Sequence, residues 1–306
     1  MDPASRAFYL LKVENALLRL RGNAFQDWFA QVMELRFPGG DFVRVRPWGN
    51  VGDRKNDGYI KSQRTLCQVY APDDFNLATT LAKIDEDFGE AKPYWEAHFD
   101  TWVFVHNAPN GIAGDVLKHL LETEVNNQPI KIGQWGAAAL RDFVFELPDA
   151  NVATLFGAAP TRRDFENLGL ADLRPVLLRL AAQDPVADVD VRPVPPRKIE
   201  ANALSANVSL LLKSGMPRAD LVQHFFDSYH DAALGDQIAS AFKARYAQLR
   251  ATGSGSDTVF WGLIDFAGGL DNHGAGHAAA VLAVIAYLFE QCEIFERPRE
   301  NMGAPT

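Results

Sequence analysis

The sequence contains little cysteine and no long uncharged apolar segment. Its two cysteines, Cys67 and Cys292, lie far apart and form no C-x-x-C pair, which excludes a zinc ribbon and argues against a disulfide framework. The longest apolar run, AAAVLAVIAYLF at 278–289, is too short to span a bilayer and predicts a buried helix. The charged N-terminal segment predicts no signal peptide. We therefore expect a cytoplasmic protein with no membrane segment.

The sequence also has no excess of positively charged residues. The formal net charge is −9 and 23% of the residues are charged, which argues against a nonspecific coat for nucleic acid. Residues 41–64 are the exception, because six basic residues accompany three acidic ones there. This locally basic segment is compatible with a phosphate-binding site in an otherwise acidic protein.

Hydrophobic periodicity divides the 306 residues into two parts. The first part alternates helices with strands, and Asn23 is the expected N-cap of its second helix. Helices are predicted at 5–21, 23–37, 76–98, 113–125 and from 136, and strands at 41–49, 57–62, 65–72, 101–109 and 129–135. This order predicts an α/β domain with a mixed central sheet over residues 1–157.

Residues 158–306 predict a second, all-α domain. Segment 184–198, DPVADVDVRPVPPRK, has four prolines and predicts a stiff, extended linker within it. From residue 200 onward the apolar residues follow helical spacing, and no repeat of 20–50 residues is apparent. The aliphatic helices are expected to support a homo-oligomer.

Potential metal chemistry is concentrated in GDRKNDGYIKSQRTLCQVYAP, residues 52–72. Asp53 and Asp57 lie in a Gly-rich turn, where aspartate is also a common turn-former. Gln68 and Tyr70 share one face of the following strand, because strand side chains alternate. Hydrolysis of a phosphodiester requires oxygen ligands for Mg²⁺ and a cation that offsets developing charge. Asp57 is expected to bind Mg²⁺ through its carboxylate, and Gln68 more weakly through its uncharged amide oxygen.

The GNAFQ helix, the Asp-Gly turn and the Q-x-Y strand together resemble the PD-(D/E)XK nuclease family, closest to its Mrr-like branch. The resemblance implies a restriction-endonuclease-like N-terminal domain and DNA cleavage that depends on Mg²⁺ or Mn²⁺. By position, Gln26 matches the helix glutamate and Asp57 the metal-binding aspartate. Gln68 matches the second ligand of the third strand, and Tyr70 matches its catalytic lysine.

Two of these positions depart from the family pattern, since Gln26 carries no charge and Tyr70 has no ammonium group. Lys55 or Lys83 is expected to take the role of the missing lysine, and Asp53 to add a negative metal ligand. The surrounding basic residues are expected to bind the DNA backbone, a contribution that falls as salt rises: Arg44, Arg46, Arg54 and Arg64.

The second half carries an independent resemblance. RKIEANALSANVSLLL and above all the closing FEQCEIFERP look like the helical C-terminal domain of proteins of ABC-three-component systems, which include the Lamassu anti-phage group. The resemblance implies an effector that works with an SMC-like ABC ATPase and a middle subunit. Joined to a nuclease-like N-terminal domain, it implies a DNA endonuclease that these partners hold inactive.

Two other functions are compatible with the residues. The glutamines at two ligand positions favour a catalytically degenerate nuclease fold that serves as a DNA-binding or protein-docking adaptor. A small-molecule hydrolase on the same sheet would need a Ser/His or Cys/His constellation, which the sequence does not present.

Overall fold

The computed structural model describes residues 1–45, 55–182, 198–270, 274–291 and 294–295. The chain forms two compact units, one of Lys12–Leu155 and one of Met1–Leu11 together with Phe156–Thr306. Helix α1 (Pro3–Arg19) contributes residues to both units.

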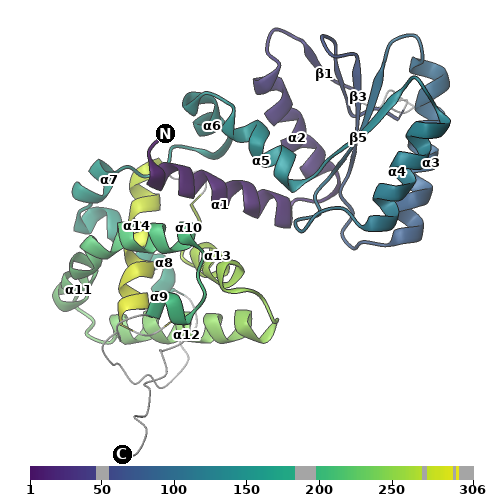
Figure 1. Ribbon diagram of the computed structural model, residues 1–306. Helices are drawn as coiled ribbons and strands as arrows, with labels where there is room; N and C mark the ends of the chain where they lie inside the picture. Colours follow the sequence, from purple (N-terminus) through teal and green to yellow (C-terminus); the bar gives the residue numbers. More distant parts are fainter. Residues whose placement is uncertain (46–54, 183–197, 271–273, 292–293, 296–306) are drawn as a thin grey trace, which may run out of the picture. The chain divides into compact units, whose positions relative to one another are not determined.

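The unit of Lys12–Leu155 is built on a five-stranded sheet with the order β1-β2-β3-β4-β5 (Figure 1). Its strands are β1 (Phe42–Arg44), β2 (Gly58–Ile60), β3 (Thr65–Tyr70), β4 (Thr101–His106) and β5 (Lys131–Trp135). Strands β1, β2 and β3 pair antiparallel, whereas β3, β4 and β5 pair parallel. The predicted mixed sheet in the N-terminal half is therefore confirmed.

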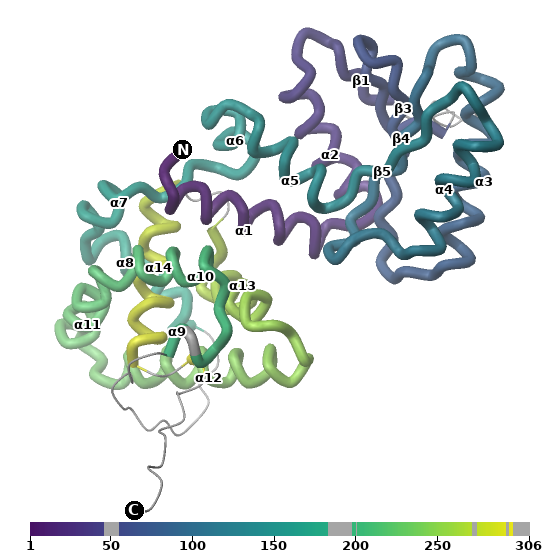
Figure 2. The backbone as a smooth tube through the Cα atoms, viewed as in Figure 1, coloured from purple at the N-terminus to yellow at the C-terminus, as the bar shows by residue number. Residues whose placement is uncertain are grey.

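Helices cover both faces of this sheet. Helices α2 (Gly22–Arg36) and α5 (Ala137–Phe145) lie on one side, and α3 (Leu77–Trp95) and α4 (Gly114–Asn126) lie on the other (Figure 2). The α3 and α4 side encloses a buried core that includes Leu66, Ile84, Phe88, Trp102, Phe104, Val116 and Leu120. Because side chains alternate along β3, Gln68 and Tyr70 lie on the same face as Leu66.

The start of α2 differs from the expectation, because its N-cap is Arg21 and not Asn23. The amide of Gly22, a glycine with φ of +47°, donates to the carbonyl oxygen of Ala71 at 2.8 Å. The carbonyl oxygen of the residue that follows β3 thus satisfies one of the helix's first amides, a role that a capping side chain usually fills. This contact holds the start of α2 beside the end of β3 and brings Gln26 to the sheet edge.

The second unit is helical. Its elements are α6 (Asp149–Phe156, which begins in the sheet unit), α7 (Arg162–Glu166), α8 (Leu170–Ala181), α9 (Lys198–Ala201), α10 (Ala206–Gly215), the 3₁₀ helix η2 (Met216–Arg218), α11 (Ala219–Ser228), α12 (Leu234–Ala251), α13 (Ser256–Phe266) and α14 (Gly274–Glu290). Helix α14 is buried along most of its length, as its apolar run predicted. Apart from Lys198, the expected proline-rich linker lies outside the described residues. Within the described parts of the chain, no helix combines the length and apolar character needed to cross a membrane.

Candidate active site

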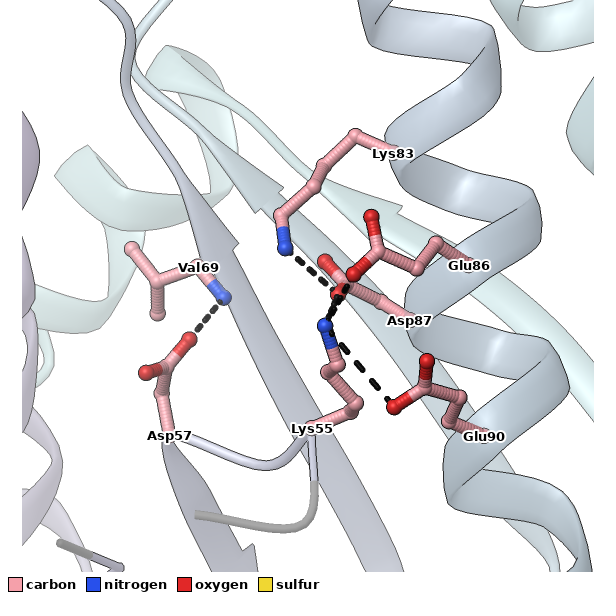
Figure 3. Close-up of polar contacts among 7 residues, drawn as sticks. All are labelled: Lys55, Asp57, Val69, Lys83, Glu86, Asp87 and Glu90. Carbon is pink, nitrogen blue, oxygen red and sulfur yellow. Dashed lines mark hydrogen bonds and ion pairs between the residues drawn. The ribbon is translucent and has the colours of Figure 1, made fainter. Parts of the chain in front are cut away.

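Asp57 precedes β2 and extends its pairing with β3. Its amide donates to the carbonyl oxygen of Cys67 at 3.0 Å. Its Oδ2 accepts from the amide of Val69 at 2.7 Å, as Figure 3 shows. Strand β2 begins at Gly58, which pairs with Cys67, so β2 has no residue opposite Val69. The carboxylate of Asp57 takes that ladder position, and its hydrogen bond holds it at the edge of β3.

Gln68 presents an amide at the same edge of the sheet. Its side chain is buried, with 5% exposed. Among the described residues, no donor reaches its Oε1. Leaving a buried acceptor unpaired costs roughly 1–3 kcal/mol, so such an atom is a natural point of contact for a bound cation or donor.

Two lysines meet a fully buried carboxylate, Asp87 of α3, next to these residues. The ammonium of Lys83 lies 2.7 Å from Oδ1 of Asp87, and that of Lys55 lies 3.6 Å from the same oxygen (Figure 3). Lys55 also pairs with Glu86 and, at 3.9 Å, with Glu90. Burial raises the pKa of Asp87, while the hydrogen bond to Glu86 raises the pKa of Lys55. Both lysines predicted from the sequence therefore contact the same carboxylate oxygen, Oδ1 of Asp87.

A single pocket of about 350 Å³ brings the predicted site residues together. Its lining includes Gln26, Lys55, Asp57, Gln68, Tyr70 and Lys83. These side chains come from α2, the turn before β2, β3 and α3, so the sheet edge unites residues that are up to 57 positions apart in the chain (83 − 26). We call this cavity the hairpin pocket.

Tyr70 forms an aromatic wall of the hairpin pocket. Its ring centroid lies 5.8 Å from that of Phe104, and the side chain packs against the core under α3 and α4. The strand position that the nuclease family gives to a lysine is thus occupied by a partly buried ring. Among the described residues, Lys55 and Lys83 are the ammonium groups that line the pocket.

The described arginines of the predicted DNA-binding set lie elsewhere. Arg44 pairs with Asp27 of α2. Arg64 follows β2 in the turn before β3, where it donates to Asp100 at 2.8 Å and to the carbonyl oxygen of Ala97 at 3.0 Å. Neither arginine lines the hairpin pocket. Asp53, Arg46 and Arg54 lie outside the described residues.

The donors around the hairpin pocket suit Mg²⁺ through a small ligand set. Mg²⁺ takes oxygen ligands, commonly one or two carboxylates with several waters. Asp57 supplies a carboxylate, and Gln68 supplies the unpaired amide oxygen. The described residues contain no cluster of three or more His, Cys, Asp and Glu side chains that could hold a metal. Asp57 and Gln68 are therefore the two residues that could hold such a cation, with water as its other ligands.

Asp87 is the residue that sequence reasoning missed. Its spacing of four from Lys83 on a helix was visible and predicts an ion pair. The approach of Lys55 from the hairpin was not visible, because it depends on how α3 packs beside the turn before β2. Burial of the carboxylate follows from the same packing.

Comparison with known proteins concerns the helical unit. Residues 171–296 match the family model of C-terminal domain 10 of the ABC-three component (ABC-3C) systems. No curated protein and no solved structure matches the chain. The resemblance of the sheet unit to PD-(D/E)XK nucleases thus stays a prediction from its residues. The resemblance of the C-terminal half is confirmed: residues 171–296 are similar to a C-terminal domain of the ABC-three component systems.

Proposed function

We propose that the protein is the effector of a bacterial anti-phage system of the ABC-three-component type and acts as a metal-dependent DNA endonuclease. The observation that carries the proposal is the hairpin pocket, in which a carboxylate, two amides and two ammonium groups converge at one sheet edge. The match of residues 171–296 supports membership of such a system. The nuclease activity rests on the pocket and on the resemblance of its residues to the PD-(D/E)XK pattern.

Five side chains of the hairpin pocket have proposed roles. Asp57 and Gln68 would hold Mg²⁺ or Mn²⁺, with Gln26 beside them. The bound ion would polarise the scissile phosphate and lower the pKa of its water. Lys83 or Lys55 would offset the negative charge that develops on the phosphate, which is the part that the strand lysine plays in the nuclease family.

We propose that the partner subunits regulate the nuclease activity. An SMC-like ABC ATPase and a middle subunit would hold the effector inactive, because unrestrained DNA cleavage would damage the host. The helical unit is the proposed contact to these subunits or to other copies of the chain. Activity should therefore be tested with the reconstituted system and not with this chain alone.

Cleavage of plasmid DNA by that system, with Asp57→Asn beside wild type, tests the proposal. The asparagine oxygen can still accept from the amide of Val69, so the sheet edge should keep its structure. Wild type should cut in the presence of Mg²⁺ or Mn²⁺, and the variant should not. Asp74→Asn, which changes an exposed aspartate of the same unit, should cut as wild type does. Equal cleavage by Asp57→Asn and wild type would sink the proposed site.

Gln68→Glu gives a complementary test, because it adds a carboxylate without changing the side-chain length. The added charge should reduce the metal concentration needed for half-maximal cleavage. Gln63→Glu, on the exposed turn between β2 and β3, is the matched control and should leave the metal requirement unchanged. An unchanged requirement in Gln68→Glu would separate Gln68 from metal binding.

The ion pairs of the two lysines favour a second function, that of a non-enzymatic adaptor for DNA or for a partner protein. Lys83 and Lys55 both contact Asp87, and Lys55 also pairs with Glu86 and Glu90, so their charges are largely balanced. A titration with Mg²⁺ or Mn²⁺ separates the two functions. Saturable binding that Asp57→Asn abolishes favours the enzyme, whereas no binding at millimolar metal favours the adaptor.

A further inference from the structure

A second pocket lies beside the hairpin pocket, at the carboxyl ends of the parallel strands β3 and β4. It has a volume of about 390 Å³, and its lining includes Arg21, Tyr70, Phe75, Phe104, His106 and Val116. Ligands of open α/β sheets bind outside the carboxyl ends of strands, and small-ligand pockets measure roughly 300–1,000 Å³. We call this cavity the aromatic pocket.

The walls of the aromatic pocket are suited to a flat ring. Phe104 is buried at its base, with the ring of Tyr70 at a centroid distance of 5.8 Å. Phe75, in the loop between β3 and α3, also lines the pocket, yet 62% of it is exposed. An exposed phenylalanine beside an apolar cavity provides a face on which a planar ligand can stack.

Both ring nitrogens of His106 in the aromatic pocket are engaged in hydrogen bonds. His106 Nδ1 accepts from the amide of Ala108 at 3.3 Å, so Nε2 carries the proton and donates to Gln134 Oε1 at 2.9 Å. Burial lowers the pKa of His106 and so favours the uncharged ring. The histidine therefore adds a flat, uncharged surface and leaves both of its nitrogens engaged.

Arg21 supplies a permanent positive charge to the same pocket. Its Nη1 donates to the carbonyl oxygens of Leu20 at 2.8 Å and Leu17 at 3.4 Å, which anchors the guanidinium. An anchored guanidinium stacks on planar rings and pairs with phosphate. A ligand that offers a planar ring to the aromatic walls and a phosphate to Arg21 has the chemistry of a nucleotide.

The two pockets adjoin each other, because Tyr70 and Pro72 line both. We infer that the aromatic pocket receives one unstacked nucleobase of a DNA strand whose backbone lies at the hairpin pocket. The base would stack on Phe75, and its neighbouring phosphate would face Arg21. This inference rests on the proposed function, since it takes DNA as the substrate.

Binding of single strands to the full-length chain in the presence of a chelator tests the inference without cleavage. The probes are a fluorescent thymidine strand of roughly 12 nucleotides, a length within the range of single-strand binding sites, and an abasic strand of equal length. Fluorescence anisotropy should show tighter binding of the thymidine strand. Phe75→Ala should weaken that binding about tenfold and leave the abasic strand unaffected, because stacking of one base is lost.

Two further variants control for nonspecific effects. Phe75→Trp retains a stacking face and should bind as wild type does. Tyr94→Ala removes another exposed aromatic side chain, with 54% of it exposed, which does not line the aromatic pocket, and it should leave both affinities unchanged. Equal affinity of wild type and Phe75→Ala for the thymidine strand would overturn the inference.

The remaining outcomes distinguish the pocket from the proposed function. Equal binding of thymidine and abasic strands would remove the base pocket and leave a DNA-binding protein. No binding of either strand would overturn the pocket, whereas the proposed nuclease is decided by plasmid cleavage in the reconstituted system. If thymidine monophosphate bound as tightly as the strand, the pocket would take free nucleotides, and the assignment to a DNA strand would be wrong.

Discussion

The ammonium of Lys83 lies 2.7 Å from Oδ1 of Asp87, a carboxylate with no exposed surface. Lys55 reaches the same oxygen from the hairpin at 3.6 Å. The only ammonium groups lining the hairpin pocket, within the described residues, are therefore paired with a buried acid. This pairing sets how much positive charge the pocket offers to a phosphate.

Asp87→Asn should strengthen DNA binding. The substitution keeps the side-chain shape but removes the negative charge that neutralises Lys83, so the pocket becomes more positive. We expect affinity to rise several-fold and the slope of log affinity against log salt to steepen by about one. Salt-dependent anisotropy titrations measure both. Asp85→Asn changes an exposed carboxylate of the same helix that pairs with His119 of α4, and it should leave the slope unchanged. A wild-type slope in Asp87→Asn would show that Lys83 is not available to DNA.

Stability of the sheet unit should fall as the pH drops below about 6.5. Burial lowers the pKa of His106 from its ordinary value of 6.5, so the unfolded chain takes up the proton first. The contribution of neutral His106 is complete above pH 6.5, is lost as the pH falls toward the folded pKa, and levels off below it. Urea unfolding between pH 5 and 8 measures this dependence. The pH dependence of the unfolding free energy should flatten in His106→Gln. It should persist in His98→Gln, which changes an exposed histidine. Identical profiles for wild type and His106→Gln would contradict it.

Lys198→Met should destabilise the helical unit by about 1–3 kcal/mol. The buried ammonium of Lys198 donates to the carbonyl oxygens of Phe289 at 2.8 Å and Ile294 at 2.6 Å, and it lies 4.5 Å from the ring of Phe289. Methionine fills similar space but leaves these carbonyls without that donor. Urea unfolding followed by circular dichroism gives the change. Lys213→Met, at an exposed position of α10, should change stability by less than about 0.5 kcal/mol. Equal stability of Lys198→Met and wild type would refute the role.

Gly215→Ala should also destabilise the helical unit, by about 1–3 kcal/mol. A Cβ at this position would lie 2.5 Å from the carbonyl oxygen and 2.8 Å from the carbonyl carbon of Leu282. Both atoms belong to the backbone of α14, so the two helices would have to separate. Gly276→Ala, at an open position of α14, should stabilise by about 0.5–1 kcal/mol, because alanine favours a helix interior. Thermal unfolding compares the two variants. A wild-type melting temperature in Gly215→Ala would show that α10 and α14 tolerate a wider spacing.

Much of the fold follows from local patterns. The short apolar segments at 65–72 and 101–109 predicted strands β3 and β4, and the apolar run at 278–289 predicted the buried α14. The shared face of Gln68 and Tyr70 followed from the strand period alone. The N-cap of α2 was wrong, because the carbonyl oxygen of Ala71, distant in the chain, receives the amide of Gly22.

The sequence by itself determined the order of helices and strands in the sheet unit, the mixed sheet and six of the side chains that line the hairpin pocket: Gln26, Lys55, Asp57, Gln68, Tyr70 and Lys83. Periodicity and turn chemistry are properties of a short stretch of residues, so they can be read without the fold. Only the tertiary structure decided that Lys55 and Lys83 share Asp87, that Arg64 turns to Asp100, and that Phe75 lines a second pocket. The physical reason is that ion pairs and cavities depend on which distant segments pack together and on how far each charge is removed from water.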